Sequence, residues 1–283
     1  MPQDVKHDSI NELKKNIISE LNKTEGNFAL VFFELRHKGE YISINDKANF
    51  HAASTMKTPV MIEVFKQAHD GKFNLDDTII VKNEFKSIVD GSLYSLNLSD
   101  DAGENLYQSI GQPKTIRELV YEMITVSSNL ATNILIDLVG AKNVMRTMKS
   151  IGAHNIQVLR GVEDLKAYDR GLNNTTDAYD LALIYRKLAE GEIVSKNACD
   201  EMISILMDQK LNNKIPAKLP LSIKVAHKTG SISGVEHDSG IIFLPNGKKY
   251  VLVILSKNLK DSQKGIETIA NVSKIIYDYM AGQ

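Results

Sequence analysis

The end of the chain carries the stretch that decides the fold, three apolar, β-rich runs in close succession: Ile223-Lys-Val-Ala226, Gly240-Ile-Ile-Phe243 and Tyr250-Val-Leu-Val-Ile254. Short runs of this composition predict strands, and the pair Asn246-Gly247 between the last two is typical of a tight hairpin turn. A closing helix is predicted from about Lys264 to Met280.

The beginning of the chain reads as a helix followed by two strands. Apolar residues recur at helical spacing within residues 9–22, and β-rich runs follow at 28–33 and 41–44. From about residue 55 to 210 helical periodicity prevails. Strands at both ends around a helical middle predict an α/β (α+β) protein, in which an antiparallel sheet built from both ends is covered by the terminal helices.

This arrangement predicts two parts with a cleft between them. Residues 1–55 and 211–283 would form the sheet domain, and residues 56–210 an inserted all-helical domain. The composition agrees with a folded protein of this size, because 43% of the 283 residues are hydrophobic and 24% are charged.

Several partners and cofactors are disfavoured by the same composition. The formal net charge is −1 without a block of like charge, so no nucleic-acid partner is expected. The longest apolar run, 250–255, is too short for a membrane span, and the first residues lack a signal peptide, so the protein is not exported or a leader has been removed. The single Cys199 and the absence of metal-binding histidine patterns and phosphate loops predict no metal and no cofactor.

The first motif with residue types suited to catalysis is Ser54-Thr-Met-Lys57, which precedes an apolar helical pattern. Residues three apart share one face of a helix, so the lysine amine lies close enough to accept the serine proton. An ordinary lysine is protonated at neutral pH, so this chemistry requires burial or a nearby positive charge that lowers its pKa. The alternative is a helix cap beside a solvated lysine.

Two further motifs follow in order. Ser127-Ser128-Asn129 separates two helical patterns, where its side chains either cap the helix from Leu130 or present a hydroxyl and an amide to a cleft. His227-Lys-Thr-Gly-Ser231 lies on or near a sheet edge, where it either grips a carboxylate or merely protects the edge with charge.

Together these three motifs resemble the active-site set of class A β-lactamases and penicillin-binding proteins. The likeness extends to the stretches 118–137, 171–176 and 237–247 and covers the chain from about residue 10 to its end. The resemblance implies a periplasmic or secreted bacterial protein connected with antibiotic resistance. It also implies a small-molecule substrate, a β-lactam or a peptidoglycan-like peptide; a monomer is the default expectation.

The resemblance also implies a role for each matching residue. Ser54 is the acylated nucleophile, Lys57 activates it or shares its proton, and Ser127 passes a proton to the departing lactam nitrogen. The substrate is held through its side-chain amide and its carboxylate, and the oxyanion hole consists of the backbone amides of Ser54 and Ser231. The expected substrate-binding residues are Asn129 for the amide and Lys228, Thr229 and Ser231 for the carboxylate.

Two departures from the family pattern bear on activity. Ser128 stands where class A enzymes usually carry Asp, which changes a supporting hydrogen bond. In the loop 160–174 the glutamate comes one place later than in the family's Arg-x-Glu-x-x-Leu-Asn pattern. Glu163 is the first candidate for the base that activates the deacylating water, and Asn173 for a residue that orients this water. The alternative is that Glu163 only pairs with Arg160 or Lys166 on a solvated loop.

Three functions remain open at this point. The leading interpretation is a serine β-lactamase that hydrolyses the acyl-enzyme on Ser54. The second is a penicillin-binding or D-alanyl-D-alanine carboxypeptidase-like hydrolase, or an esterase, that deacylates β-lactams slowly. The third is a sensor or binding module that is only acylated.

Overall fold

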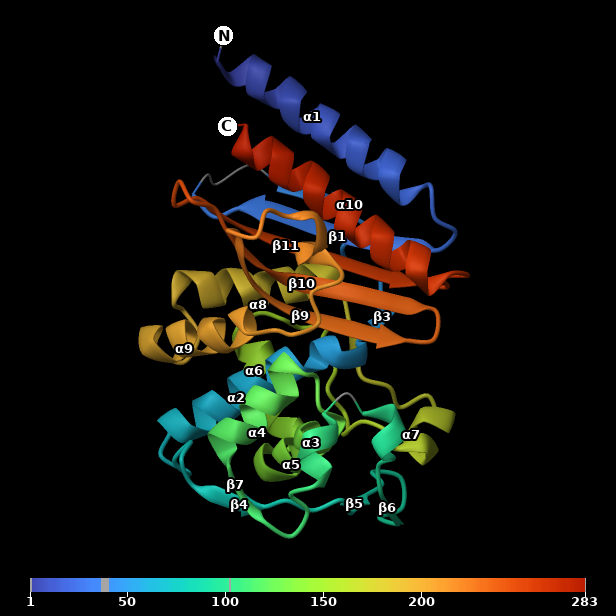
Figure 1. The fold of residues 1–283 in the computed structure, drawn as a ribbon, viewed down its shortest axis with the longest axis vertical. Helices are drawn as coiled ribbons and strands as arrows, with labels where there is room; N and C mark the ends of the chain where they lie inside the picture. Colours follow the sequence, from blue (N-terminus) through green and yellow to red (C-terminus); the bar gives the residue numbers. More distant parts are fainter. Residues whose placement is uncertain (1, 37–40, 102, 283) are drawn as a thin grey trace.

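A five-stranded antiparallel sheet runs through the middle of the protein in the computed structural model, which describes residues 2–36, 41–101 and 103–282 (Figure 1). Both ends of the chain supply its strands, as the sequence predicts. From one edge to the other the order is β2 (Tyr41–Ile44), β1 (Asn27–Glu34), β11 (Lys249–Lys257), β10 (Val235–Phe243) and β9 (Lys224–Ile232).

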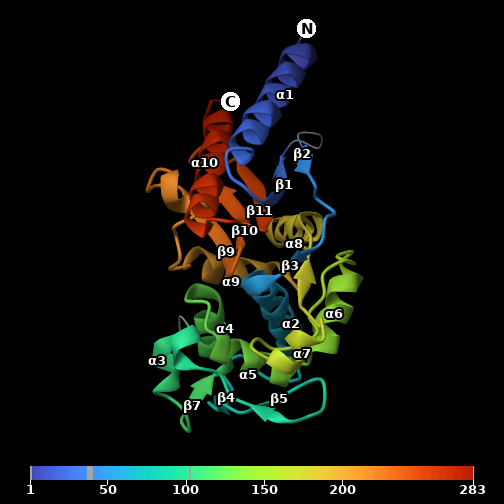
Figure 2. The ribbon, with the colours of Figure 1, turned by 90° about the vertical axis from the view of Figure 1, so that its right-hand side faces the viewer.

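The two terminal helices cover one face of this sheet. Helices α1 (Pro2–Leu21) and α10 (Ser262–Ala281) lie side by side across it, as Figures 1 and 2 show. Their apolar residues form one buried core with the strand side chains that point toward them, among them Leu30, Phe32 and Ile254. This layer confirms the predicted packing of the terminal helices on the sheet.

The opposite face of the sheet is covered as well. Helix α8 (Ala178–Glu190) packs against β1, β10 and β11, and α9 (Lys196–Met207) packs against β9. Their side chains join those of the sheet and of the helical middle in a second core, which extends without interruption from Ala29 in β1 to Leu206 in α9. The helices after residue 177 therefore belong to the layers around the sheet, and the helical region before them forms the lower half of the molecule in Figure 1.

The lower half consists of helices and short strand pairs around the central helix α2. Its helices are α2 (Lys57–His69), α3 (Glu104–Tyr107), α4 (Ile116–Thr125), α5 (Asn129–Val139), α6 (Ala141–Ser150) and α7 (Leu165–Asp169). Its strands pair as β4 (Thr78–Ile80) with β7 (Pro113–Thr115) and β5 (Phe85–Lys86) with β6 (Leu93–Tyr94), whereas β3 (Phe50–His51) pairs with β8 (Thr175–Thr176) next to strand β11 of the main sheet. The short 3₁₀ turns are η1 (Ala53–Met56), η2 (Leu98–Asp100) and η3 (Ile215–Lys218).

The edge strand β9 and the turn η1 meet where the sheet faces the lower half. This contact brings the third predicted motif against the first. Within the described ranges, no helix has the length and apolar character needed to cross a membrane.

Candidate active site

Ser54 lies in η1, directly before helix α2, which confirms its predicted place at a helix start. The backbone before it is tied down, because the amide of Ala52 donates to the carbonyl of Asn174 (2.9 Å) and the amide of Ala53 donates to Nδ1 of His51 (3.0 Å). Ala53 has a φ of 45°, a value uncommon for residues other than glycine. Backbone conformations of this kind cluster at functional sites.

Lys57 is fully buried, so the alternative of a solvated lysine is wrong. Its Nζ donates to the Ser127 carbonyl (2.6 Å), to Ser127 Oγ (3.1 Å) and to Asn129 Oδ1 (2.9 Å). Burial lowers the pKa of Lys57 to about 7, although the negative charges of Asp101 and Glu163 oppose this shift. Near neutral pH about half of the Lys57 amine is therefore unprotonated and able to accept a proton.

Ser127 occupies the turn between α4 and α5 and has a φ of 62°. Its hydroxyl lies between two lysines, because Lys228 Nζ donates to Ser127 Oγ at 2.9 Å in addition to the bond from Lys57. Burial lowers the pKa of Lys228 well below its ordinary value, and the positive charges of Lys57 and Lys214 lower this pKa further. The Ser127 hydroxyl can thus exchange protons with either amine.

Ser128 caps helix α5, since its Oγ accepts from the amide of Ala131 (3.2 Å). The capping interpretation of this motif is confirmed for Ser128, while Asn129, the first residue of α5, reaches Lys57. A carboxylate missing from the motif is supplied by another segment. Asp101 is buried and accepts from the amides of Asn129 (2.9 Å) and Leu130 (2.8 Å), with Ser128 Oγ at 3.4 Å. Sequence reasoning missed Asp101, because nothing in its own neighbourhood links it to a motif 27 residues away.

Strand β9 is an edge strand, as predicted, but its motif is not a charged surface. Lys228 and Thr229 are buried, whereas Ser231 is exposed at the strand's end. At Gly230 a Cβ atom would lie 3.2 Å from the Ser54 amide nitrogen, so glycine allows the strand to approach the nucleophile's turn. The three motifs therefore converge on one place.

Glu163 lies in the loop before α7 and has a φ of 61°. Its Oε1 accepts from Asn129 Nδ2 (2.9 Å), and Asn129 in turn accepts from Lys57. The two cations proposed as its alternative partners bond elsewhere: Arg160 donates to two loop carbonyls and to Asn173 Oδ1 (3.1 Å), and Lys166 donates to the β5–β6 hairpin. The glutamate thus joins the lysine cluster, while Asn173 lies against the Arg160 guanidinium.

The backbone on both sides of Glu163 is fixed by side chains. Asn133 accepts from the Val162 amide (2.7 Å) and donates to its carbonyl (3.0 Å). Asp164, the next residue, accepts from Ser87 Oγ and from the Ile88 amide, each at 2.9 Å. The hairpin around β5 and β6 consequently anchors the loop that carries the glutamate.

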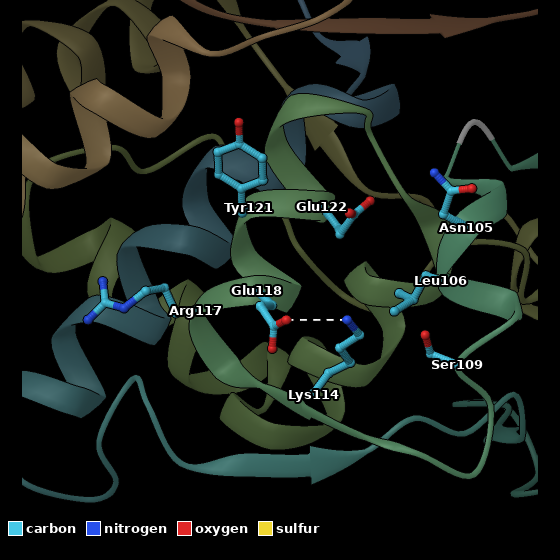
Figure 3. Close-up of a pocket in the computed structure, with 8 residues that line it drawn as sticks. All are labelled: Asn105, Leu106, Ser109, Lys114, Arg117, Glu118, Tyr121 and Glu122. Carbon is cyan, nitrogen blue, oxygen red and sulfur yellow. Dashed lines mark hydrogen bonds and ion pairs between the residues drawn. The ribbon is translucent and has the colours of Figure 1, made fainter.

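A separate pocket of about 320 Å³ opens between α3 and α4 (Figure 3). Its charged groups are partly paired, since Lys114 donates to Glu118 at 3.2 Å and Arg117 bonds to residues outside the pocket. Burial raises the pKa of Glu122, which points into this space in Figure 3. The lysine–serine cluster does not line it. In the described part of the chain, no group of three or more His, Cys, Asp or Glu side chains is arranged to hold a metal ion.

Comparison with known proteins agrees with this geometry. Residues 11–280 match the model of the beta-lactamase enzyme family, and the chain belongs to this family. The class A resemblance seen in the motifs is thereby confirmed.

Individual relatives span nearly the whole chain. A "Beta-lactamase" of Bacteroides uniformis is 23% identical over 98% of this chain and 94% of its own length. The crystal structure of a beta-lactamase from Sphaerobacter thermophilus is 28% identical, with a TM-score of 0.80 over 96% of this chain and 97% of that one. A single-residue mutant of PBP-A, solved as an acyl-enzyme complex with penicillin G, is also 28% identical, with a TM-score of 0.81 and the same coverage.

Proposed function

We propose that the protein is a serine β-lactamase that works through an acyl-enzyme on Ser54. The observation that carries this proposal is the side chain of Asn129, which bonds to Lys57 through its oxygen and to Glu163 through its nitrogen. One amide therefore joins the base needed for acylation to the carboxylate needed for deacylation. A site that only became acylated would not need the second group so close.

Acylation begins with the amine of Lys57, whose pKa near 7 suits a general base at neutral pH. It takes the Ser54 proton while Ser54 Oγ attacks the lactam carbonyl. The backbone amides of Ser54 and Ser231 stabilise the negative charge on the carbonyl oxygen; loss of one such donor typically costs about 10²–10³ in rate. When the carbon–nitrogen bond breaks, Ser127 gives its proton to the nitrogen and regains one from the Lys57 ammonium, over the observed 3.1 Å contact.

Deacylation needs a water molecule beside the ester. Glu163 would take a proton from this water as its oxygen attacks the ester carbonyl, and Ser54 Oγ would leave with that proton when the carbon–oxygen bond breaks, which restores the Glu163 carboxylate. Asn173 is our candidate for orienting the water, although it bonds to Arg160 here. The substrate carboxylate would lie along Lys228, Thr229 and Ser231, and its negative charge would favour the ammonium form of Lys228.

A second function is favoured by two specific observations. The glutamate in the loop is displaced by one position relative to the family pattern, and PBP-A is among the similar structures. A penicillin-binding or peptidase-like hydrolase would use the same acylation machinery but release the β-lactam slowly. A pure sensor would stop at the acyl-enzyme.

One experiment separates these functions. The protein is mixed with a fluorescent penicillin, and the label on Ser54 is followed over time beside the hydrolysis of a chromogenic cephalosporin. A β-lactamase loses the label within seconds and consumes the cephalosporin catalytically. A label that persists for hours indicates the second function, and no label with any β-lactam overturns both. We expect action outside the cytoplasm, in keeping with the family.

A further inference from the structure

A buried ion pair lies directly behind the end of strand β9. Lys214 precedes η3 and Glu236 lies in β10, and Lys214 Nζ is 2.7 Å from Glu236 Oε2. The exposed fractions of these side chains are 2% and 7%. Lys214 Nζ also donates to the carbonyls of Gly230 and His237, each at 3.2 Å. Neither charged residue belongs to a motif that the sequence singles out.

Both members of the ion pair form hydrogen bonds with the hydroxyl of Ser231. Ser231 Oγ accepts from Lys214 Nζ at 2.8 Å and donates to Glu236 Oε2 at 2.7 Å. Ser231 and Glu236 are direct partners in the β9–β10 register, so this contact is built into the sheet. A hydroxyl has a single proton, and here that proton faces a resident carboxylate.

We infer that Glu236 determines how strongly the site depends on a carboxylate in its substrate. Its carboxylate accepts the Ser231 proton, which a ligand carboxylate at this end of β9 would otherwise bind, and it neutralises the Lys214 ammonium buried behind the strand. Of the three residues proposed to bind the substrate carboxylate, Ser231 thus donates to Glu236 instead, so Lys228 and Thr229 hold an anionic substrate while Glu236 repels it. The inference rests on the proposed function, because it assumes acylation of Ser54 with the substrate carboxylate along β9.

This arrangement makes the wild-type protein tolerant of substrates without a negative charge at that position. An uncharged acyl donor loses no charge-assisted hydrogen bond from Ser231, because Glu236 already accepts the proton of that hydroxyl. Specificity is a difference between affinities, and a repulsive group is one way to set it. The selected substrate class is therefore β-lactams or related acyl donors in which this group is neutral or weakly anionic.

The test compares a fluorescent penicillin with its own methyl ester, which differs in the charge of this carboxylate. The variant is Glu236→Gln, which keeps the side-chain size and removes the negative charge. We expect its second-order rate of Ser54 acylation to rise about tenfold with the penicillin and by less than about twofold with the ester. The gain should appear in the half-saturating concentration and not in the maximal rate.

A second variant guards against a folding effect, because Glu236→Gln leaves Lys214 buried without its counter-charge. Combining Lys214→Met with Glu236→Gln removes both charges, and this double variant should keep only the smaller part of the gain, which comes from the freed Ser231 proton. Glu34→Gln is a matched control, since Glu34 is a buried carboxylate in β1 on the side of the sheet that carries α1 and α10. It should leave both rates unchanged.

The outcomes separate the two proposals. If the parent forms no adduct on Ser54, the proposed function fails. If the parent is acylated but Glu236→Gln leaves the ratio of penicillin to ester unchanged or lowers it, only the inference about Glu236 is overturned. A gain of undiminished size in the double variant would also overturn it, because the charge of Lys214 would then have no part in the effect.

Discussion

Replacing Asp101 with Asn tests whether this residue supports the Ser127–Asn129 turn from outside the motif. One oxygen of Asp101 accepts from the amides of Gly103 (2.8 Å) and Asn129 (2.9 Å), and the other accepts from Leu130 (2.8 Å). An asparagine keeps only one acceptor oxygen, so its NH₂ group must face at least one of these donors. The variant therefore leaves a buried backbone amide unpaired and loses the charge of the acceptor.

The expected loss follows from these bonds. An unpaired buried donor costs about 1–3 kcal/mol, and hydrogen bonds to a charged group are worth about 1.5–3 kcal/mol. Allowing for partial relaxation, the free energy of unfolding should fall by about 2–4 kcal/mol. At about 2–4 °C per kcal/mol for a chain of this size class, Tm should fall by between about 4 and 16 °C, which calorimetry measures directly.

A second substitution gives this prediction its sharpest form. Ser128→Asp places a carboxylate inside the motif, next to Ser128's present neighbour Asp101. Alone it should destabilise the protein, because two buried carboxylates would then face each other. In the Asp101→Asn background, Ser128→Asp should raise Tm and should also increase acylation by a fluorescent penicillin. The reasoning is refuted if Ser128→Asp lowers Tm equally in both backgrounds, or if Asp101→Asn costs less than about 1 kcal/mol.

Three further predictions concern the steps at Ser54. Because the pKa of Lys57 is lowered to about 7, acylation should rise with pH and reach half its maximum near pH 7; a pH profile with its midpoint above about 9 contradicts the role of Lys57 as base. Glu163→Gln should accumulate acyl-enzyme and slow hydrolysis by about 10² or more, and unchanged turnover would remove Glu163 from the mechanism. Asp164→Ala frees the loop from the β5–β6 hairpin, so hydrogen exchange in residues 160–174 should accelerate and deacylation should slow about tenfold while acylation stays constant. Faster exchange with unaltered deacylation would show that this anchoring does not position Glu163.

The sheet could be predicted from the sequence, but not its full extent. The apolar run after Ile223 predicts a strand that ends at Ala226, yet β9 continues to Ile232. The residues between them are polar, and strand patterns depend on apolar alternation. His227 to Gly230 are nevertheless buried, and Ser231 is exposed, so the sequence signal fails where the strand contributes to the candidate site.

From the sequence we do not predict that helices α8 and α9 cover the second face of the sheet. A signal for it exists in β11, where Tyr250 to Leu255 are all apolar and all buried. Continuous apolar strands indicate that both faces are covered, whereas alternation indicates one. The division into residues 1–55 with 211–283 and 56–210 stays a prediction. The paired strands β3–β8 and β5–β6 are too short to leave any periodic pattern.

The candidate site was predictable where a local motif carries it. Ser54, Lys57, Ser127 and Lys228 could be named from three short stretches, and the structure brings the last three together through one hydroxyl. Asp101, Lys214 and Glu236 could not, because each acts through a partner that only the tertiary fold brings near. The roles assigned to all these residues, and to Glu163 and Asn173, stay predictions.

The uninterrupted core from β1 to α9 has a mechanical consequence for catalysis. Two halves that share one close-packed interior expose apolar side chains to water when they separate about a hinge, so a large opening motion would be costly. Differences in substrate choice within this fold would then arise from the loops and side chains around the Lys57–Ser127 cluster, which can change while the scaffold beneath them stays rigid.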